Sequence, residues 1–116
     1  MREKQMKRAG VDIRSDGQVL VLGGDLDVRS TFELRAALYD HLDAQGEDLL
    51  GPVVVDVTEV SSVDATALKV LAAASRQASV HGVRMVLRGA CPAVLRMLHL
   101  THLIRVVEVE RDPIPA

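Results

Sequence analysis

Two carboxylates separated by one residue, Asp25 and Asp27, are the first side chains in this sequence whose types and spacing could do chemistry. As a general acid and base they would need an apolar pocket and a substrate cleft to set their pKa values apart, and the sequence predicts neither. We expect both in a turn after an apolar strand. There Asp27 either pairs with an arginine of a binding partner or has only a structural role in the turn.

A second group of polar side chains, Ser62, Asp64 and Thr66, follows a run of valines. Asp64 is predicted to be a helix N-cap, because its carboxylate can accept a hydrogen bond from the first helical turn. That turn also presents free N–H groups and the positive end of the helix dipole, which tolerate a phosphate. This turn would therefore tolerate a negatively charged group on the hydroxyl of Thr66. The plain alternative is that the Thr66 hydroxyl only meets water or backbone.

Two histidines, His99 and His102, have a spacing that could hold a metal ion if both were on one helix. No third ligand is evident, and Cys91 falls at the other end of the same short helix, so we expect no metal site. Cys91 is interpreted as a small helix-entry residue. The sequence has no phosphate loop, dinucleotide fingerprint or serine-triad motif. We expect no cofactor and no enzymatic activity.

Composition narrows the class of protein further. The chain has 116 residues, 48% of them hydrophobic, with a formal net charge of -2 and a single cysteine. This size suits one domain, and the near absence of aromatic residues means a core of Val, Leu, Ile and Ala. The acidic balance argues against a nucleic-acid partner. No apolar run approaches the ~20 residues of a membrane span, and no secretory signal is evident. We expect a cytoplasmic protein without membrane insertion.

The apolar periodicity predicts the element order β-β-α-β-α-β-α-β. A hairpin turning at Asp16-Gly17 is expected first. The first predicted strand starts at Val11. The other four cover about Gln18 to Leu22, Val53 to Val57, Val83 to Leu87 and Leu103 to Val109. The predicted helices follow a capping box of Ser30 and Glu33, the N-cap Asp64, and Pro92 at a first helical position.

This order predicts a mostly parallel sheet, since strands separated by helices join by right-handed crossovers. The unbroken Val53 to Val57 run is expected at the centre, and the Val11 strand at an edge. Asp27 and the turn after Asp64 should share the C-terminal edge of the sheet, where open α/β sheets present their binding loops. We divide the chain into a flexible N-terminus (1–10), one domain (11–110) and a tail (111–116).

Three segments in this order resemble the STAS domain, which sulfate transporters and anti-sigma-factor antagonists share. The first is Gly24-Asp25-Leu26-Asp27. The second is Val53 to Val57 with Val63 to Leu68, and the third is Pro92 to Val94 with Leu98 to Leu103. The resemblance extends from Val11 to Val109. It implies a four-to-five-stranded mixed β-sheet with helices mainly packed on one face.

The resemblance also implies a regulatory role. A family antagonist binds an anti-sigma factor, often a serine-protein kinase, and so releases a sigma factor for transcription. The kinase can phosphorylate the antagonist at the start of the helix after the central strand, and a phosphatase reverses this. By this resemblance the partner-binding residues would be Asp27, Asp64, Ala65, Thr66, Ala67 and Leu68.

The sequence departs from the family pattern at the switch. The usual phosphoacceptor is the first Ser or Thr after the motif aspartate, and here Ala65 occupies that position while Thr66 follows it. The resemblance therefore makes Thr66, or alternatively Ser62, the candidate phosphoacceptor. Ala67 and His102 stand where the family often has glycine. A second interpretation therefore stays open, a non-switching STAS scaffold subunit of a stress-signalling or lipid-transport complex.

Overall fold

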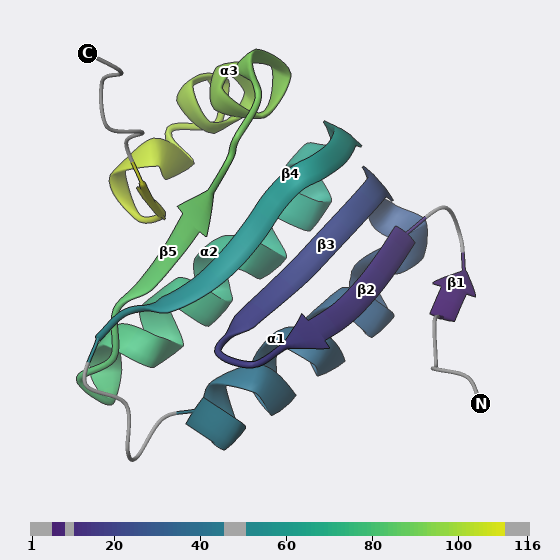
Figure 1. The fold of residues 1–116 in the computed structure, drawn as a ribbon. Helices are drawn as coiled ribbons and strands as arrows, with labels where there is room; N and C mark the ends of the chain where they lie inside the picture. The colour runs from purple at the N-terminus through teal and green to yellow at the C-terminus, as the bar shows by residue number, and fades with distance from the viewer. Residues whose placement is uncertain (1–5, 9–10, 46–50, 111–116) are drawn as a thin grey trace, which may run out of the picture.

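A mixed six-stranded sheet forms the framework of the protein in the computed structural model, which describes residues 6–8, 11–45 and 51–110 (Figure 1). The strands lie side by side in chain order: β1 (Met6–Arg8), β2 (Val11–Asp16), β3 (Val19–Leu26), β4 (Val53–Val63), β5 (Met85–Arg88) and β6 (Glu108–Val109). The first two neighbouring pairs are antiparallel and the other three are parallel.

Three helices and two short 3-10 helices connect the strands. They are η1 (Val28–Ser30), α1 (Thr31–Gln45), α2 (Ala65–Val80), α3 (Pro92–Leu100) and η2 (Leu103–Arg105). Figure 1 shows α1 and α2 together on one face of the sheet, with α3 beyond the C-terminal end of β5. The predicted α/β class, mixed sheet and one-sided helix layer are confirmed, and β4 lies between β3 and β5 as predicted.

The N-terminal side of the sheet differs from the prediction in one respect. The Val11 strand is not the edge, because β1 pairs antiparallel with its outer side, with Met6 opposite Ile13 and Arg8 opposite Val11. Only residues 6–8 of the segment 1–10 are described. The remaining residues of that segment, residues 46–50 of the predicted loop and the predicted tail 111–116 lie outside the described residues.

Strands β3 and β4 both run further than predicted. Their parallel pairing continues to Leu26 opposite Val63, with shifts of register around the glycine pair Gly23-Gly24. A Cβ atom on Gly23 would lie 3.1 Å from the Cβ of Glu59, and Gly24 has a φ of +81°. The two glycines therefore let β3 bulge and stay paired with β4, whereas their sequence suggested the end of the strand.

The last predicted strand, Leu103 to Val109, is wrong over most of its length. The N–H groups of Val106 and Val107 both donate to the carbonyl oxygen of Leu103 at 2.9 Å, which coils this segment into η2. Pairing with β5 begins only at Glu108, opposite Val86. The backbone groups of this segment are therefore bonded locally, within a helical turn, and not to the neighbouring strand. A short apolar run fits either a helical turn or a strand, so the sequence pattern does not distinguish them.

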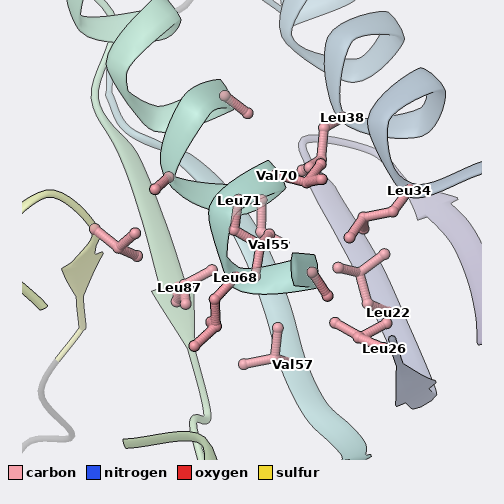
Figure 2. Close-up of a cluster of buried hydrophobic side chains, with 14 of the residues drawn as sticks. Leu22, Leu26, Leu34, Leu38, Val55, Val57, Leu68, Val70, Leu71 and Leu87 are labelled. Atoms are coloured by element: carbon pink, nitrogen blue, oxygen red, sulfur yellow. The ribbon is translucent and has the colours of Figure 1, made fainter. Parts of the chain in front are cut away.

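The hydrophobic core lies between the sheet and the pair α1 and α2. Figure 2 shows leucines of both helices meeting side chains of β3, β4 and β5 in one cluster. The labelled members are Leu22, Leu26, Leu34, Leu38, Val55, Val57, Leu68, Val70, Leu71 and Leu87. Leu68 and Leu71 are fully buried, so the first two turns of α2 are held firmly against the sheet.

Candidate functional site

The C-terminal ends of β3 and β4 bring together two of the predicted site residues. Leu26 is paired with Val63, and the N–H of Asp64 donates to the carbonyl oxygen of Leu26 at 3.0 Å. Asp27 follows β3 at the edge of the sheet where Asp64 follows β4. The predicted proximity of Asp27 to the first turn of α2 is confirmed.

Asp64 joins the two segments that leave this edge. Its Oδ1 accepts a hydrogen bond from the N–H of Ala67 at 2.9 Å, which makes it the N-cap of α2 as predicted. Its Oδ2 accepts a second hydrogen bond from the N–H of Val28 in η1 at 3.1 Å. Each oxygen thus satisfies a backbone donor of a different element. The carboxylate fixes the position of η1 relative to α2.

Asp27 caps η1 and is paired with its own neighbour. Its Oδ1 accepts from the backbone N–H of Arg29 at 3.0 Å, and its Oδ2 lies 2.7 Å from Nη2 of the same arginine. The hydrogen bond from the Arg29 side chain is the main cause that lowers the pKa of Asp27 below its ordinary value. Asp27 is therefore ionised near neutral pH, and its charge is matched inside the chain.

The predicted capping box of Ser30 and Glu33 is wrong by one turn. The box consists of Asp27 and Ser30: the Asp27 N–H donates to Ser30 Oγ at 3.1 Å, while Asp27 caps the turn. Since η1 runs directly into α1, the helical segment begins earlier than the sequence suggested, and Ser30 is fully buried. Oε1 of Glu33 has no hydrogen-bond partner among the described residues.

Asp25 and Ser62 form a separate contact across β3 and β4. Ser62 Oγ donates to Asp25 Oδ1 at 2.8 Å, and the two residues are paired in the register of the sheet. The hydroxyl of the alternative phosphoacceptor is thus already bonded to a carboxylate. A phosphate on Ser62 would meet that negative charge directly.

The first turn of α2 divides into a surface side and a core side. Thr66 is exposed, Ala65 is half-buried, and Lys69 is exposed one turn later. Ala67 and Leu68 are fully buried, so they support the turn from beneath and are not available to a partner. The Thr66 hydroxyl makes no hydrogen bond to any described residue. A chemical group added to it would project into solvent.

The family model described as "Mlab, STAS domain" matches residues 9–108. The chain belongs to the STAS domain family. The resemblance carried by the three sequence segments is thereby confirmed.

Solved structures with the same fold include an anti-sigma factor antagonist from Mycobacterium paratuberculosis. It is 20% identical, with a TM-score of 0.68 over 88% of this chain and 85% of that one. RsbS from Moorella thermoacetica, as a substituted variant, is 24% identical, with a TM-score of 0.61 over 89% and 87% of the two chains. The phosphorylated form of the Bacillus cell fate determinant SpoIIAA is 12% identical, with a TM-score of 0.56 over 88% and 92%. At these identities the likeness concerns the fold.

His102 shows how this STAS domain accommodates a departure from the family pattern. It follows α3 with a φ of +64°, the only positive φ of a non-glycine residue among those described. The left-handed conformation after a helix end explains why glycine suits this position. His102 lies outside the helix that carries His99. No group of three His, Cys, Asp or Glu side chains that could hold a metal ion occurs in the described part of the chain.

Cys91 is the N-cap residue of α3, with Pro92 at the first position, as the sequence predicted. Its side chain makes no capping hydrogen bond.

Among the helices that the structure describes, none is long and apolar enough to span a membrane.

Two surface residues of this STAS domain were not singled out from the sequence. Val28 and Phe32 are large apolar side chains with exposed fractions of 61% and 76%. The available signal was the position of Phe32 outside the Leu34, Leu38 and Leu42 stripe, which places it on another side of the helix. Val28 begins η1, where its backbone N–H bonds to the cap Asp64, and Phe32 lies in the first turn of α1.

Proposed function

We propose that this STAS domain is an anti-sigma-factor antagonist. In this role it binds an anti-sigma factor, which is often a serine-protein kinase, and so releases a sigma factor for transcription. The observation that carries the proposal is the Asp64 carboxylate, which holds η1 and the first turn of α2 on one surface. The family membership and the anti-sigma factor antagonist of the same fold support it.

The proposed contact surface consists of Asp27, Ala65 and Thr66. The other three predicted residues support this surface and do not form part of it. Asp64 has both carboxylate oxygens bonded to backbone N–H groups, and Ala67 and Leu68 are buried in the core. We propose no catalytic role and no cofactor for any of these residues. The protein acts by competitive binding in the cytoplasm.

Thr66 is the proposed phosphoacceptor, with Ser62 as the alternative. The exposed hydroxyl of Thr66 suits modification by a kinase, whereas that of Ser62 is held by Asp25. A phosphate adds about -1.5 to -2 charge, which the N-terminus of α2 tolerates within the chain. On a partner surface matched to the unmodified helix, this charge must be desolvated or meets repulsion. A phosphatase restores the binding form.

The proposal is tested with purified anti-sigma factors of the source organism. Calorimetry measures which of them binds the full chain, and in vitro transcription measures whether the chain restores sigma-dependent initiation. Binding together with restored initiation supports the antagonist role. If no anti-sigma factor binds, the antagonist role is refuted.

A second function is favoured by Ala65. With no hydroxyl at the usual acceptor position, the domain is suited to a non-switching scaffold subunit of a stress-signalling or lipid-transport complex. Size-exclusion chromatography of the complex isolated from source cells separates the two functions. Co-elution with several STAS chains or a transporter supports the scaffold, whereas a complex with an anti-sigma factor supports the antagonist.

A further inference from the structure

Four large apolar side chains are strongly exposed in the described part of the chain, and two of them are close together in the sequence. Val28 and Phe32 are four residues apart in the continuous helical segment formed by η1 and α1. They are therefore separated by about one helical turn along this segment. The other two, Val80 and Leu100, are at the ends of α2 and α3. The pair of Val28 and Phe32 is termed the apolar patch below.

The apolar patch is attached to the site already described. The backbone N–H of Val28 donates to Asp64 Oδ2, and Asp64 Oδ1 caps the helix whose first turn carries Thr66. The structure thus fixes the backbone of Val28 beside that turn, and Phe32 follows about one helical turn later along the chain. Phe32 is also the only phenylalanine of the chain. A large aromatic ring left in water costs free energy that burial in a partner pocket would recover.

The charges around the apolar patch indicate the rim of that pocket. Asp25 lies at the end of β3, and Asp27 and Asp64 follow β3 and β4 directly. Arg29 is paired with Asp27 and is also attracted by Asp25. Hydrogen bonding to Arg29 keeps Asp27 ionised near neutral pH. Against these three carboxylates stand Arg29 and the exposed Lys69, so this edge carries a net negative charge beside the apolar patch. A complementary partner has an apolar pocket bordered by lysine or arginine.

We propose that Val28 and Phe32 form the centre of the partner-binding surface, and that their occupant is an apolar, basic-rimmed pocket on the anti-sigma factor. This inference rests on the proposed function. Buried aromatic side chains at the centre of an interface carry much of the binding energy. The proposal also gives a reason for a switch at Thr66, since a phosphate near the patch must be desolvated when the pocket closes over Phe32.

The test measures binding of the source organism's purified anti-sigma factors to three forms of the full chain by calorimetry. They are the wild type, the double variant Val28→Ser with Phe32→Ser, and the control Val80→Ser. Val80 has an exposed fraction of 73% and lies at the opposite end of α2 from Thr66, so it matches Val28 in type and exposure. Circular dichroism melting checks folding, which these surface changes should leave intact.

The expected result is a loss of affinity on the order of 30-fold or more for the double variant, the size of an interface hot spot. Val80→Ser should stay within about twofold, as expected of a surface change outside the interface. Equal affinity of the double variant and the wild type would refute the role of the apolar patch in binding, and would leave the proposed function unaffected. Absence of binding by the wild type to every anti-sigma factor overturns the proposed function, and the named occupant with it.

A photo-crosslinker placed at position 32 or 80 in source cells gives a second readout. A crosslink to the anti-sigma factor from position 32, but not from position 80, supports contact at the patch. A crosslink from position 32 to another copy of this chain, or to a protein of another class, overturns the named occupant.

Discussion

Asp64 and Val28 are joined by a hydrogen bond across two elements that lie far apart in the sequence. The N–H of Val28 donates to Asp64 Oδ2 at 3.1 Å, while Asp64 Oδ1 caps α2. One side chain thus satisfies a donor in the segment after β3 and a donor in the helix after β4. A carboxylate suits this position because each of its two oxygens can accept one of the bonds.

Replacing Asp64 should separate these two contributions to stability. Asp64→Ala removes both acceptors, and we expect a loss of about 2 kcal/mol in the free energy of unfolding. Asp64→Asn keeps an oxygen for the N–H of Ala67 but turns an NH₂ group toward Val28, so its loss should lie between wild type and Asp64→Ala. Urea denaturation measures all three proteins. Equal stability of Asp64→Asn and the wild type would mean that the Val28 bond contributes nothing.

The Asp27–Arg29 pair predicts a pH dependence of stability. The pKa of Asp27 is lowered in the folded protein, mainly by hydrogen bonding to Arg29. A carboxyl group of this kind stabilises the fold at pH values above its unfolded pKa of about 4. That contribution is lost as the pH falls through the lower, folded pKa. Asp27→Asn should therefore melt at a lower temperature than the wild type at neutral pH, with a difference that shrinks in acid.

Melting curves by circular dichroism between neutral pH and about pH 2 measure this difference, because the window must extend below the ordinary aspartate pKa. Arg29→Gln serves as the matched control, since it removes the partner charge and leaves Asp27 in place. A constant gap between wild type and Asp27→Asn at every pH would show that the charge of Asp27 is irrelevant to stability.

The proximity of Asp27 and Asp64 was predictable because it depends on topology alone. Two parallel strands that are neighbours in a sheet must end at the same edge, and the element order shows which residues follow them. The cap Asp64 was predictable from its residue type just before an apolar helical stripe. These inferences need only local sequence and the handedness of crossovers.

Other features depended on contacts that one sequence does not display. Gly23 and Gly24 were expected to end a strand, but pairing with β4 and the close approach of Glu59 turn them into a bulge. Ala67 could not be assigned to the core, because an alanine near a helix start fits surface and interior equally. The helical period alone placed Phe32 outside the leucine stripe of α1, but it did not show how far the ring is exposed.

Gly89 should be the least replaceable of the glycines with positive φ. It has a φ of +79°, and an added Cβ would overlap Oγ1 of Thr58 and lie 3.1 Å from its Cβ. Gly17 has a φ of +62° but open space around its Cβ position. We expect Gly17→Ala to cost about 1 kcal/mol, from backbone strain alone, and Gly89→Ala to cost about 3 kcal/mol, because overlap adds to strain.

Thermal and urea unfolding of both variants measure these costs. Thr58→Ala in the Gly89→Ala background removes the overlapping hydroxyl, so it should recover part of the lost stability. A double variant no more stable than Gly89→Ala alone would show that backbone strain, not the overlap, sets the cost.

The switch proposed at Thr66 predicts opposite effects for two substitutions. Thr66→Glu should weaken binding to the cognate anti-sigma factor by about 1–3 kcal/mol, because its carboxylate must be desolvated against the partner. Thr66→Ala should leave the affinity nearly unchanged. Neither change should unfold the chain, since Thr66 is exposed and a glutamate in the first turn of a helix interacts favourably with the helix dipole.

Calorimetry measures the affinities, and mass spectrometry after incubation with the kinase maps the phosphate. Ser79→Glu is the charge control, because Ser79 is also an exposed hydroxyl residue of α2 but lies in its last turn. Ala65→Ser restores the usual family acceptor and should create or strengthen kinase-dependent phosphorylation. Equal affinity of Thr66→Glu and the wild type, with no phosphate on Thr66, would mean that the chain is a constitutive binder or a scaffold. Since the Asp64 cap is made to the N–H of Ala67 and not to Thr66, either outcome should report on the surface of the first turn and not on its folding.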